Sequence, residues 1–416
     1  MSIAETSKPL SKTETTCRIC LSSKLNPILS LGKTPLANSL LRDAGQQTEN
    51  RFPLDLVFCS DCSLVQITET VNPEVLFSDY VYFSSFADTT LKSAEKLVNR
   101  LIADRKLNDS SLAAEIASND GYLLQYYLRS GIRVLGIEPA QNIASVARKK
   151  GIDTIAEFFG LDVAQKLSNS GIKADVIHAN NVLAHVAELN GVVEGMSVFL
   201  KDDGVILIEA PYLEPMLDHT EFDTIYHEHL CYFSLTALDK LFRSHKLYIN
   251  DVEQLSIHGG SLRLFIEKKE QPTSNVKEML EQEANGGVKS ASHYEQFSNK
   301  VQKLKSDLLA LLKDLKSQKK SIAVYGASAK GSTLMNYFGI GKELVDFVVD
   351  RSTVKQGLYT PGNHLAILPP EKLLEAKPDY VVLLTWNFVD EILEQQKAYR
   401  ELGGKFIVPI PELKVV

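Results

Sequence analysis

Leu112-Ala-Ala-Glu-Ile116, Ala-Ser-Asn-Asp-Gly121 and Tyr122-Leu-Leu-Gln-Tyr-Tyr-Leu128 follow one another in the sequence. The first run is short and apolar, the second contains the polar residues and glycine typical of turns, and the third is helix-like. A further apolar run, Arg133-Val-Leu-Gly-Ile137, ends at Glu138. This strand–turn–helix–strand order predicts a parallel sheet and an α/β fold.

The same alternation continues towards the C-terminus. Two more strands are expected, Asp175-Val-Ile-His-Ala179 and Gly204-Val-Ile-Leu-Ile208, and they end in Asn180-Asn181 and Glu209. Ligands of open parallel sheets bind beyond the carboxyl ends of the strands. We therefore expect these polar strand ends to face one crevice.

A second, smaller Rossmann-like domain is expected near the C-terminus. Residues 271–320 are rich in Lys, Glu and Gln and carry a leucine stripe, which predicts a long amphipathic helical connector. After it the alternation restarts, with predicted strands at Ser321-Ile-Ala-Val-Tyr325, Leu344-Val-Asp-Phe-Val-Val349, Tyr380-Val-Val-Leu-Leu384 and Lys405-Phe-Ile-Val408. We expect three domains, which are residues 1–72 with a disordered N-terminal tail (Met1 to Thr16), 73–272 and 273–416.

Composition excludes several classes of protein. The formal net charge of −7 argues against non-specific nucleic-acid binding. No apolar run approaches the roughly 20 residues needed to cross a bilayer, and the polar N-terminus lacks the apolar centre of a secretory signal. We expect a cytoplasmic protein with neither membrane nor nucleic acid as a partner, monomeric or weakly homo-oligomeric.

Four of the five cysteines form two CxxC pairs, Cys17/Cys20 and Cys59/Cys62. Two such pairs can offer four thiolates at tetrahedral spacing, which suits a closed, structural Zn²⁺ site. A local Cys/His site is excluded because the first histidine is His178. Reduced free thiols or a redox pair are the alternatives.

The turn at Gly121 and the acid at Glu138 form the minimum pattern for binding an adenosine. Glycine lets the ligand approach the backbone, and Glu138 can accept hydrogen bonds from both ribose hydroxyls. A pyrophosphate dinucleotide usually requires GxGxxG, whereas this turn has one glycine together with Glu115 and Asp120. Negative charge suits the sulfonium and ammonium groups of S-adenosylmethionine. An ordinary turn with a stray acid is the alternative.

The segment from Glu221 to Ser234 concentrates acid–base side chains. His227 and His229 alternate with Tyr226 and Glu228, so an extended backbone would place the two pairs on opposite faces. A His–Glu–His metal site and buried structural polar residues are alternatives. Acid–base catalysis is favoured, because imidazole can remove a proton beside a ketone while hydroxyls stabilise the enolate.

Three other stretches can join this site. His185 lies just beyond a strand end, in the expected crevice. Tyr80 and Tyr82 form an aromatic cluster that is core by default, and His258-Gly-Gly-Ser261 resembles a turn with N–H donors and a hydroxyl.

A second glycine-framed loop, Gly326-Ala-Ser-Ala-Lys330-Gly331, stands between a strand and a helix. Its backbone donors and the helix N-terminus suit a diphosphate, although the lysine precedes the second glycine and so does not make a Walker A loop. Asp350 ends the next strand and Lys355 follows it. A vestigial Rossmann loop is the alternative.

The motifs together resemble the three-domain, zinc-containing C-methyltransferases of nucleotide-deoxysugar biosynthesis across nearly the whole chain. The matching stretches are Cys17-x-x-Cys20 with Leu-Gly-x-x-Pro-Leu-Ala-Asn38, Cys59-x-x-Cys62, Phe77-Ser-Asp-Tyr80, Glu115-Ile-Ala-Ser-Asn-Asp-Gly-Tyr122, Gly136-Ile-Glu-Pro139, Asn180-Asn-Val-Leu-Ala-His185, Phe222-Asp-Thr-Ile-Tyr-His-Glu-His229, His258-Gly-Gly-Ser-Leu-Arg263 and Tyr359-Thr-Pro-Gly362. The resemblance implies a small zinc-binding domain, a central class I methyltransferase domain and a C-terminal Rossmann-like domain. It implies a dTDP-linked keto-sugar as substrate, although Ala-Ser-Ala-Lys330 departs from relatives and leaves the nucleotide open.

The site residues follow from the motifs and this resemblance. The expected catalytic residues are His229 as base, Glu228 as its support, and Tyr226, His185 and Tyr80 as enolate stabilisers. Expected S-adenosylmethionine contacts are Glu115, Ser118, Asp120, Gly121, Glu138, Pro139, Asn180 and Asn181. Expected substrate contacts are Tyr82, His258, Ser261, Ser328, Lys330, Asp350 and Lys355. An O- or N-methyltransferase and a non-enzymatic zinc adaptor are the competing interpretations.

Overall fold

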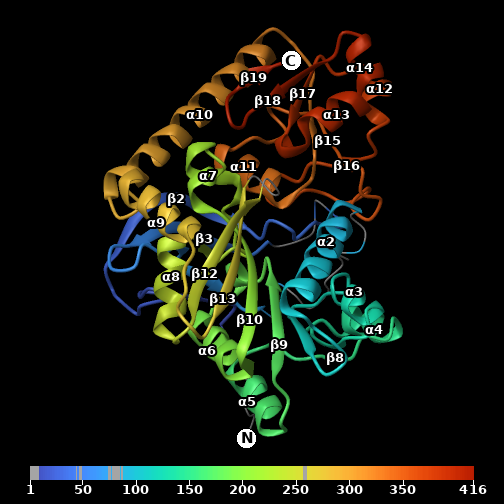
Figure 1. Ribbon diagram of the computed structural model, residues 1–416. Helices are drawn as coiled ribbons and strands as arrows, with labels where there is room; N and C mark the ends of the chain where they lie inside the picture. Colours follow the sequence, from blue (N-terminus) through green and yellow to red (C-terminus); the bar gives the residue numbers. More distant parts are fainter. Residues whose placement is uncertain are drawn as a thin grey trace, which may run out of the picture.

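The computed structural model describes residues 9–43, 45, 49–73, 76, 85, 88–255 and 260–416. Figure 1 shows two large α/β units one above the other, with the N-terminal strands packed beside their junction. Among the described residues, no helix combines the length and the apolar character needed to cross a bilayer.

A seven-stranded sheet forms the centre of the chain, in the order β12-β13-β10-β9-β6-β7-β8. β13 runs antiparallel to both of its neighbours, whereas β10, β9, β6, β7 and β8 are parallel. The chain reverses its direction of travel between β6 and β9, which is where ligands bind in sheets of this type. The strands are β6 (Leu112–Ile116), β7 (Arg133–Ile137), β8 (Thr154–Ile155), β9 (Ala174–Asn180), β10 (Leu200–Pro211), β12 (Tyr248–Leu255) and β13 (Ser261–Glu267).

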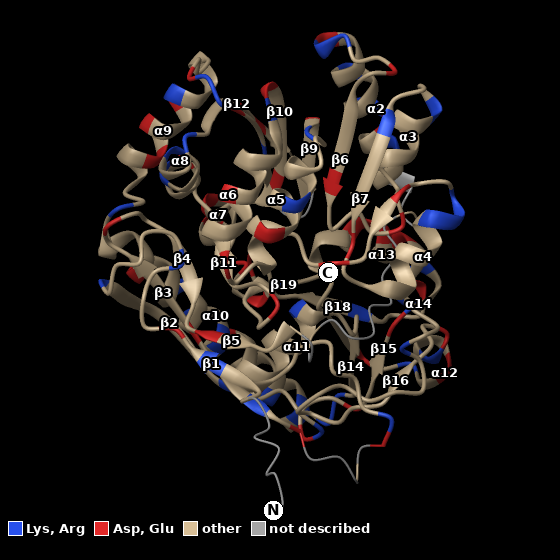
Figure 2. Cartoon of the chain, turned by 90° about the horizontal axis from the view of Figure 1, so that it is seen from below, with Lys and Arg blue, Asp and Glu red and all other residues tan. Residues whose placement is uncertain are grey.

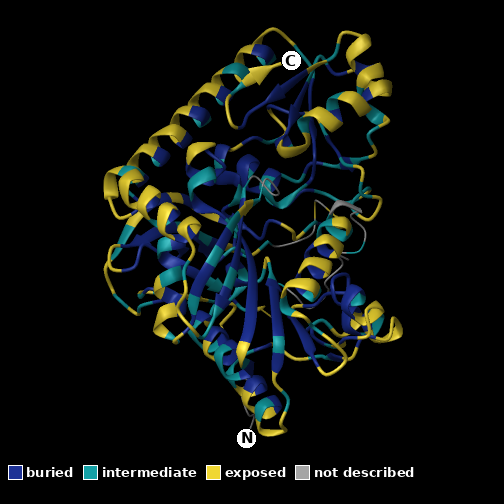
Figure 3. Cartoon of the chain, in the orientation of Figure 1, coloured by how far each residue is buried: buried dark blue, intermediate teal, exposed yellow. Residues whose placement is uncertain are grey.

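Helices cover both faces of this sheet. In Figure 3 the parallel strands are dark blue, buried, and the outer surfaces of the helices are yellow, exposed. The helices are α2 (Asp88–Arg105), α3 (Leu124–Arg129), α4 (Gln141–Lys149), α5 (Leu161–Asn169), α6 (Leu189–Phe199), α7 (Leu213–Asp218) and α8 (Leu235–Ser244), with short 3₁₀ turns η2 (Leu183–His185) and η3 (Phe222–Thr224).

The C-terminal sheet has six strands in the order β16-β15-β14-β17-β18-β19, parallel except for β19. Its strands are β14 (Ile322–Tyr325), β15 (Val348–Val349), β16 (Ile367–Leu368), β17 (Tyr380–Leu383), β18 (Lys405–Val408) and β19 (Lys414–Val415). Its helices are α11 (Ala329–Phe338), α12 (Lys372–Ala376), α13 (Val389–Gln395) and α14 (Lys397–Glu401), with the 3₁₀ turn η5 (Trp386–Phe388). The fold-class prediction of two Rossmann-like sheets is confirmed.

The N-terminal region forms a four-stranded antiparallel sheet in the order β11-β4-β3-β2. Its strands are β2 (Leu25–Pro35), β3 (Arg51–Cys59), β4 (Val65–Ile67) and β11 (Cys231–Tyr232). The last strand, β11, lies between β10 and β12 in the sequence. The segment expected to carry catalysis therefore runs directly into the N-terminal sheet.

The expected tail of Met1 to Thr16 contains one ordered strand. β1 (Ser11–Thr13) pairs with β5 (Glu69–Val71), because the hydroxyls of Ser11 and Thr13 both donate to the Glu69 carboxylate. The prediction of a disordered tail is thus wrong for this stretch.

The connector is two helices, α9 (Ser274–Gly286) and α10 (Ala291–Ser317), rather than one. The break falls at Gly287, whose φ of +94° ends α9 in the left-handed region. α10 runs along the upper left edge of the molecule in Figure 1, from α9 to the C-terminal sheet, and its Tyr294 ring stacks on Phe58 of β3 at 4.5 Å. The helix therefore links all three sheets through one apolar core.

Candidate active site

The turn after β6 has an unusual backbone. Ala117, Asn119 and Gly121 have φ values of +52°, +49° and +77°, in the left-handed region. A Cβ at Gly121 would lie 2.0 Å from Ile152 Cδ1, so glycine is required there for two reasons. The turn brings backbone atoms close to the end of the sheet, where a ligand can reach them.

Glu138, at the end of β7, holds this turn. Its two carboxylate oxygens accept hydrogen bonds from the backbone N–H groups of Asn119, at 3.0 Å, and Ala140, at 2.9 Å. Pro139 lies between Glu138 and α4. Burial raises the pKa of Glu138, and the two N–H donors oppose that rise. The predicted ribose acceptor therefore also shapes the turn.

Four buried oxygen atoms around the turn have no hydrogen-bond partner among the described residues. They are Glu115 Oε2, Ser118 Oγ, Asp120 Oδ1 and Asn180 Oδ1. Leaving such atoms buried and unpaired is costly, so their presence around one turn indicates a polar ligand. Figure 2 shows the acidic positions, in red, at the tip of β6 and just beyond β7.

The acidic side chains around the turn can meet a cationic cofactor, because a bound cation would stabilise their ionised forms. Burial, and after it the charge of Glu138, raises the pKa of Glu115. Asp120 is partly neutralised by Lys150, whose Nζ lies 2.7 Å from Oδ2, and it also accepts a hydrogen bond from Ser85. Asn181 is exposed at the end of β9, with its N–H bonded to the Glu209 carbonyl at 2.7 Å. These residues fit a ligand with a sulfonium and an ammonium group.

The catalytic candidates Tyr226 and His229 meet in a tight turn, not on an extended strand. The N–H of His229 donates to the Tyr226 carbonyl at 2.9 Å, which closes the turn. As a result the Tyr226 hydroxyl lies 2.8 Å from His229 Nε2, although strand alternation would have separated the two side chains. His229 Nδ1 lies 3.0 Å from the carbonyl oxygen of Thr224.

His185 and Glu228 complete this cluster. The His185 ring stands edge-on to the His229 ring at 5.0 Å. Burial lowers the pKa of His185, and a hydrogen bond to the backbone of Glu228 opposes that shift. The Glu228 carboxylate accepts a 2.7 Å hydrogen bond from Asn38 Nδ2. Sequence reasoning missed Asn38 as a site residue, although it stands in a quoted motif.

His227 points away from the cluster. It is 1% exposed, its Nε2 donates to the Pro53 carbonyl at 3.1 Å, and its ring packs edge-on against Phe52. His227 therefore fits the alternative interpretation of a buried, structural polar residue. Among the described residues, the four cysteines, and not the His–Glu–His stretch, form the group with the spacing of metal ligands.

A second unanticipated contact fixes the start of the same segment. Trp386 Nε1 donates to Asp223 Oδ2 at 2.8 Å, and the Asp223 side chain is fully buried with its pKa raised by that burial. Lys330 Nζ sits 4.5 Å from the centre of the Trp386 ring on its other side. A residue of the C-terminal domain thus bonds this segment at Asp223, three residues before Tyr226.

The four CxxC sulfur atoms converge. All lie within 4.8 Å of one another, with Cys17 and Cys62 3.4 Å apart and Cys20 and Cys59 3.5 Å apart. Tetrahedral zinc with Zn–S bonds of about 2.3 Å requires sulfur atoms roughly 3.8 Å apart. The cluster fits zinc in a closed site. Cys59 is the last residue of β3, so the cluster adjoins the four-stranded sheet that also contains β11.

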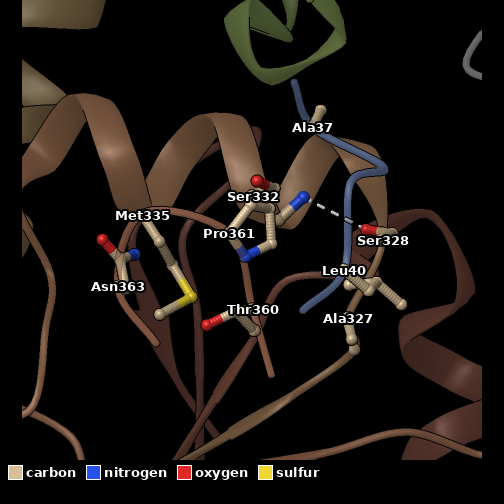
Figure 4. A pocket seen from close by; sticks show the side chains of 11 residues that line it. Ala37, Leu40, Ala327, Ser328, Ser332, Met335, Thr360, Pro361 and Asn363 are labelled. Carbon is tan, nitrogen blue, oxygen red and sulfur yellow. Dashed lines mark hydrogen bonds between the residues drawn. The ribbon is translucent and has the colours of Figure 1, made fainter. Parts of the chain in front are cut away.

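The second glycine loop uses its polar groups internally. Ser328 Oγ accepts from the Gly331 N–H at 3.1 Å, which caps α11 (Figure 4). Asp350 accepts from the Ala327 N–H at 2.7 Å, and Lys355 Nζ donates to the Ala327 carbonyl at 2.9 Å. Only a small hollow of about 10 Å³, roughly the space of one water molecule, remains between this loop, residues 360–363 and the N-terminal residues Ala37 and Leu40.

Three predicted residues, Tyr80, Tyr82 and His258, lie outside the described residues. Ser261 begins β13, next to Pro211 at the end of β10. The assignment of roles to individual site residues stays a prediction, and so do the domain boundaries.

Comparison with known proteins identifies the family. C-methyltransferase NovU of Streptomyces niveus is 36% identical over 408 residues, which are 96% of this chain and 96% of that protein. The chain belongs to the C-methyltransferase family. Family models match this C-methyltransferase in three successive parts, described as a zinc binding domain (residues 17–77), a methyltransferase domain (87–250) and a C-methyltransferase C-terminal domain (256–411).

Solved structures resemble about half of this C-methyltransferase. Magnesium protoporphyrin IX methyltransferase from Synechocystis PCC 6803, with bound S-adenosylmethionine, is 14% identical with a TM-score of 0.34 over 47% of this chain and 89% of that one. Protein PH0226 from Pyrococcus horikoshii OT3 is 16% identical with a TM-score of 0.37 over 45% of this chain and 95% of that one.

Several predictions are confirmed by the family and the structure together. The enzyme class is methyltransferase, methyl transfer is to carbon, and the cofactors are S-adenosylmethionine and zinc. The competing interpretations of a zinc adaptor and of an O- or N-methyltransferase are thereby less well supported. A small-molecule substrate follows from the class.

Proposed function

We propose that this C-methyltransferase methylates the carbon beside the carbonyl of a nucleotide-linked keto-deoxysugar, most simply a dTDP-sugar, through an enolate. Bound S-adenosylmethionine supplies an electrophilic methyl group. The protein has to remove a proton from the sugar carbon, stabilise the enolate oxygen and hold that carbon in line with the methyl group.

The hydrogen bonding of His229 carries the proposal. Its Nδ1 faces the Thr224 carbonyl, which can only accept, so in the neutral ring the proton is on Nδ1. Nε2 is then an acceptor, pointing at the Tyr226 hydroxyl. A neutral imidazole with a fixed tautomer and an outward lone pair is what a general base needs near neutral pH.

The neighbours of His229 support the enolate step. The Tyr226 hydroxyl is a donor that can turn from Nε2 to an enolate oxygen when substrate binds. Burial lowers the pKa of His185, which favours the neutral ring, and the N–H of that ring can donate to the enolate oxygen. Glu228 is the carboxylate closest in sequence, and it supports the imidazolium that forms when His229 takes the proton.

The second Rossmann-like domain supports a nucleotide-linked substrate. α11 presents an N-terminus to the hollow of Figure 4, and Lys330 provides a positive charge next to an indole ring. Ser328, Asp350 and Lys355 shape the loop from within. We assign the nucleotide to this side of the cluster and the sugar to the side of His229 and Ser261.

Exchange of the sugar proton for deuterium tests the proposal. The enzyme is incubated in D₂O with dTDP-, GDP- and UDP-linked keto-sugars and S-adenosylhomocysteine, and the substrate is followed by NMR. One keto-sugar should lose its proton beside the carbonyl without being methylated. Turnover of a substrate with no exchange, or methylation of a hydroxyl or an amine, would contradict the enolate route.

Two variants separate the base from its surroundings. His229→Ala should abolish exchange and methylation together while leaving affinity for S-adenosylmethionine unchanged. His245→Ala, the same change at a histidine that bonds Asn190 outside the cluster, should leave both rates intact. Near-normal exchange in His229→Ala would remove His229 from the role of base.

A further inference from the structure

One side chain of the zinc-binding region reaches the catalytic cluster. Asn38 stands three positions after β2, and its Nδ2 donates to Glu228 Oε1 at 2.7 Å across 190 positions of sequence. Zinc binding does not use this residue, and neither does methyl transfer as proposed above.

We propose that Asn38 is a positioning residue for methyl transfer, which fixes the Glu228 carboxylate so that Glu228 can support His229. The inference rests on the proposed function, because it gives Asn38 a role only if Glu228 has one. It also gives the zinc-binding region a part in the reaction, as the element that delivers Asn38.

The loop that carries Asn38 is anchored on both sides. Leu36 and Ala37 are buried, at 8% and 6% exposure, and the Ser39 N–H bonds the Leu36 carbonyl at 3.1 Å. Leu41 then pairs with Tyr359 of the C-terminal domain through N–H to carbonyl bonds of 2.9 and 2.8 Å. The Asn38 amide is therefore presented from a fixed backbone, and the residue itself is exposed.

A glutamate needs such a partner to keep one orientation. Its side chain has three rotatable bonds, and ordering it costs free energy that a hydrogen bond can offset. The Glu228 backbone is already held, because it bonds His185 and because the neighbouring His227 and Leu230 bond Pro53 and Ile67 of the zinc-binding region. The hydrogen bond from Asn38 fixes the Glu228 carboxylate as well.

Asn38 also favours the ionised form of that carboxylate. Burial raises the pKa of Glu228, and the hydrogen bond from Asn38 opposes the rise. The other titratable groups of the cluster are His185, Tyr226 and His229. Because an N–H donor stabilises the charged form, its removal moves the loss of ionised Glu228 to higher pH.

The test compares matched asparagine substitutions in one domain. Asn38→Ala should lower kcat about tenfold or more, as loss of a hydrogen bond to a charged group predicts. Zinc content, melting temperature and S-adenosylmethionine affinity should stay at wild-type values, and the acid limb of the pH profile of kcat should move up. Asn26→Ala removes an exposed 3.3 Å bond to the Lys24 carbonyl in the same region and should change none of these.

Asn38→Asp and a double variant make the result decisive. Asn38→Asp keeps the size of the side chain but sets a second carboxylate against Glu228, so it should lower kcat at least as far as Asn38→Ala. Adding Asn38→Ala to Glu228→Gln should cost nothing further. Full additivity in the double variant, or wild-type kcat in Asn38→Asp, would overturn the inference.

Failure of the underlying function has a different signature. If Glu228→Gln alone retains wild-type exchange and turnover, the proposed role of Glu228 is wrong. If Glu228→Gln is impaired while both Asn38 variants are normal, only the positioning role of Asn38 is lost.

Discussion

The two Rossmann-like turns of this C-methyltransferase are built alike. In each, an acid at the end of the second strand accepts two backbone hydrogen bonds. One comes from an N–H group of the turn, and the other comes from the N–H group two residues after the acid. Glu138 does so with Asn119 and Ala140, and Asp350 does so with Ala327 and Ser352. In each, a glycine with positive φ stands where a Cβ would collide.

The turns differ in what they leave unpaired. The first leaves four buried oxygen atoms without partners among the described residues, and two of them belong to the acids Glu115 and Asp120. Around the second, Tyr325, Asn363 and Thr385 also have unpaired buried atoms, but none of these side chains is acidic, and Ser328 and Lys355 bond the backbone of their own loop. A fold therefore does not by itself make a cofactor site. Unpaired acidic oxygen atoms distinguish the turn that fits S-adenosylmethionine.

The largest expected effect is at the glycine of the first turn. Gly121→Ala should destabilise the protein by about 3 kcal/mol and weaken S-adenosylmethionine binding, because both the backbone angle and the contact with Ile152 are unfavourable. Gly131→Ala has the same φ of about +75° with open space around it, and should cost only about 1 kcal/mol. Denaturant unfolding and calorimetric titration measure both, and equal losses would refute the steric argument.

Replacing the acid of each turn by its amide, in separate variants, tests whether the two turns bind different ligands. Glu138→Gln should weaken S-adenosylmethionine binding about tenfold or more. The carboxylate accepts the two N–H bonds with two charged oxygens, whereas the amide has a single, neutral accepting oxygen. Asp350→Asn is the matched change, and it should leave that affinity intact while raising KM for the nucleotide sugar. Equal effects of the two variants on cofactor affinity would mean that the cofactor is not confined to the first turn.

The contact beside the second turn should have a smaller effect. Trp386→Phe keeps an aromatic ring beside Lys330 but removes the indole N–H that donates to the Asp223 carboxylate, so stability should fall by about 1–2 kcal/mol and kcat with it. Adding Asp223→Asn should recover part of the stability, because a neutral buried amide costs less than an unpaired charge. An additive loss in the double variant would contradict the direct coupling.

The smallest expected effect is on pH dependence. Burial raises the pKa of both Glu115 and Glu138, so the ligand-free protein loses stability as pH rises from the ordinary glutamate value through these raised values. A bound sulfonium favours the ionised carboxylates, so affinity for S-adenosylmethionine should rise over the same range by less than about tenfold. S-Adenosylhomocysteine, which lacks the sulfonium, should show a weaker dependence in parallel titrations.

Much of the framework was predictable because its signals are local. The strands at Leu112–Ile116 and Arg133–Ile137 fall where the apolar runs predict them. The prediction of a single connector helix was wrong because it followed the polar composition and the leucine stripe and passed over Asn285-Gly286-Gly287, a turn signal. That Tyr226 and His229 share one site was expected, but the turn that brings them together could not be read from the alternation of residues, since an extended backbone would have separated them.

The sequence by itself determined the alternation of strands and helices, the four-cysteine zinc site, the glycine turn and the acids that end the strands, since each depends on residues close together in the chain or on a regular period. Only the tertiary structure decided that Asn38 meets Glu228, that Trp386 meets Asp223, and that β11 joins the zinc-binding sheet. The physical reason is range. These contacts join residues more than 150 positions apart, and no local pattern records which distant partner a side chain will find.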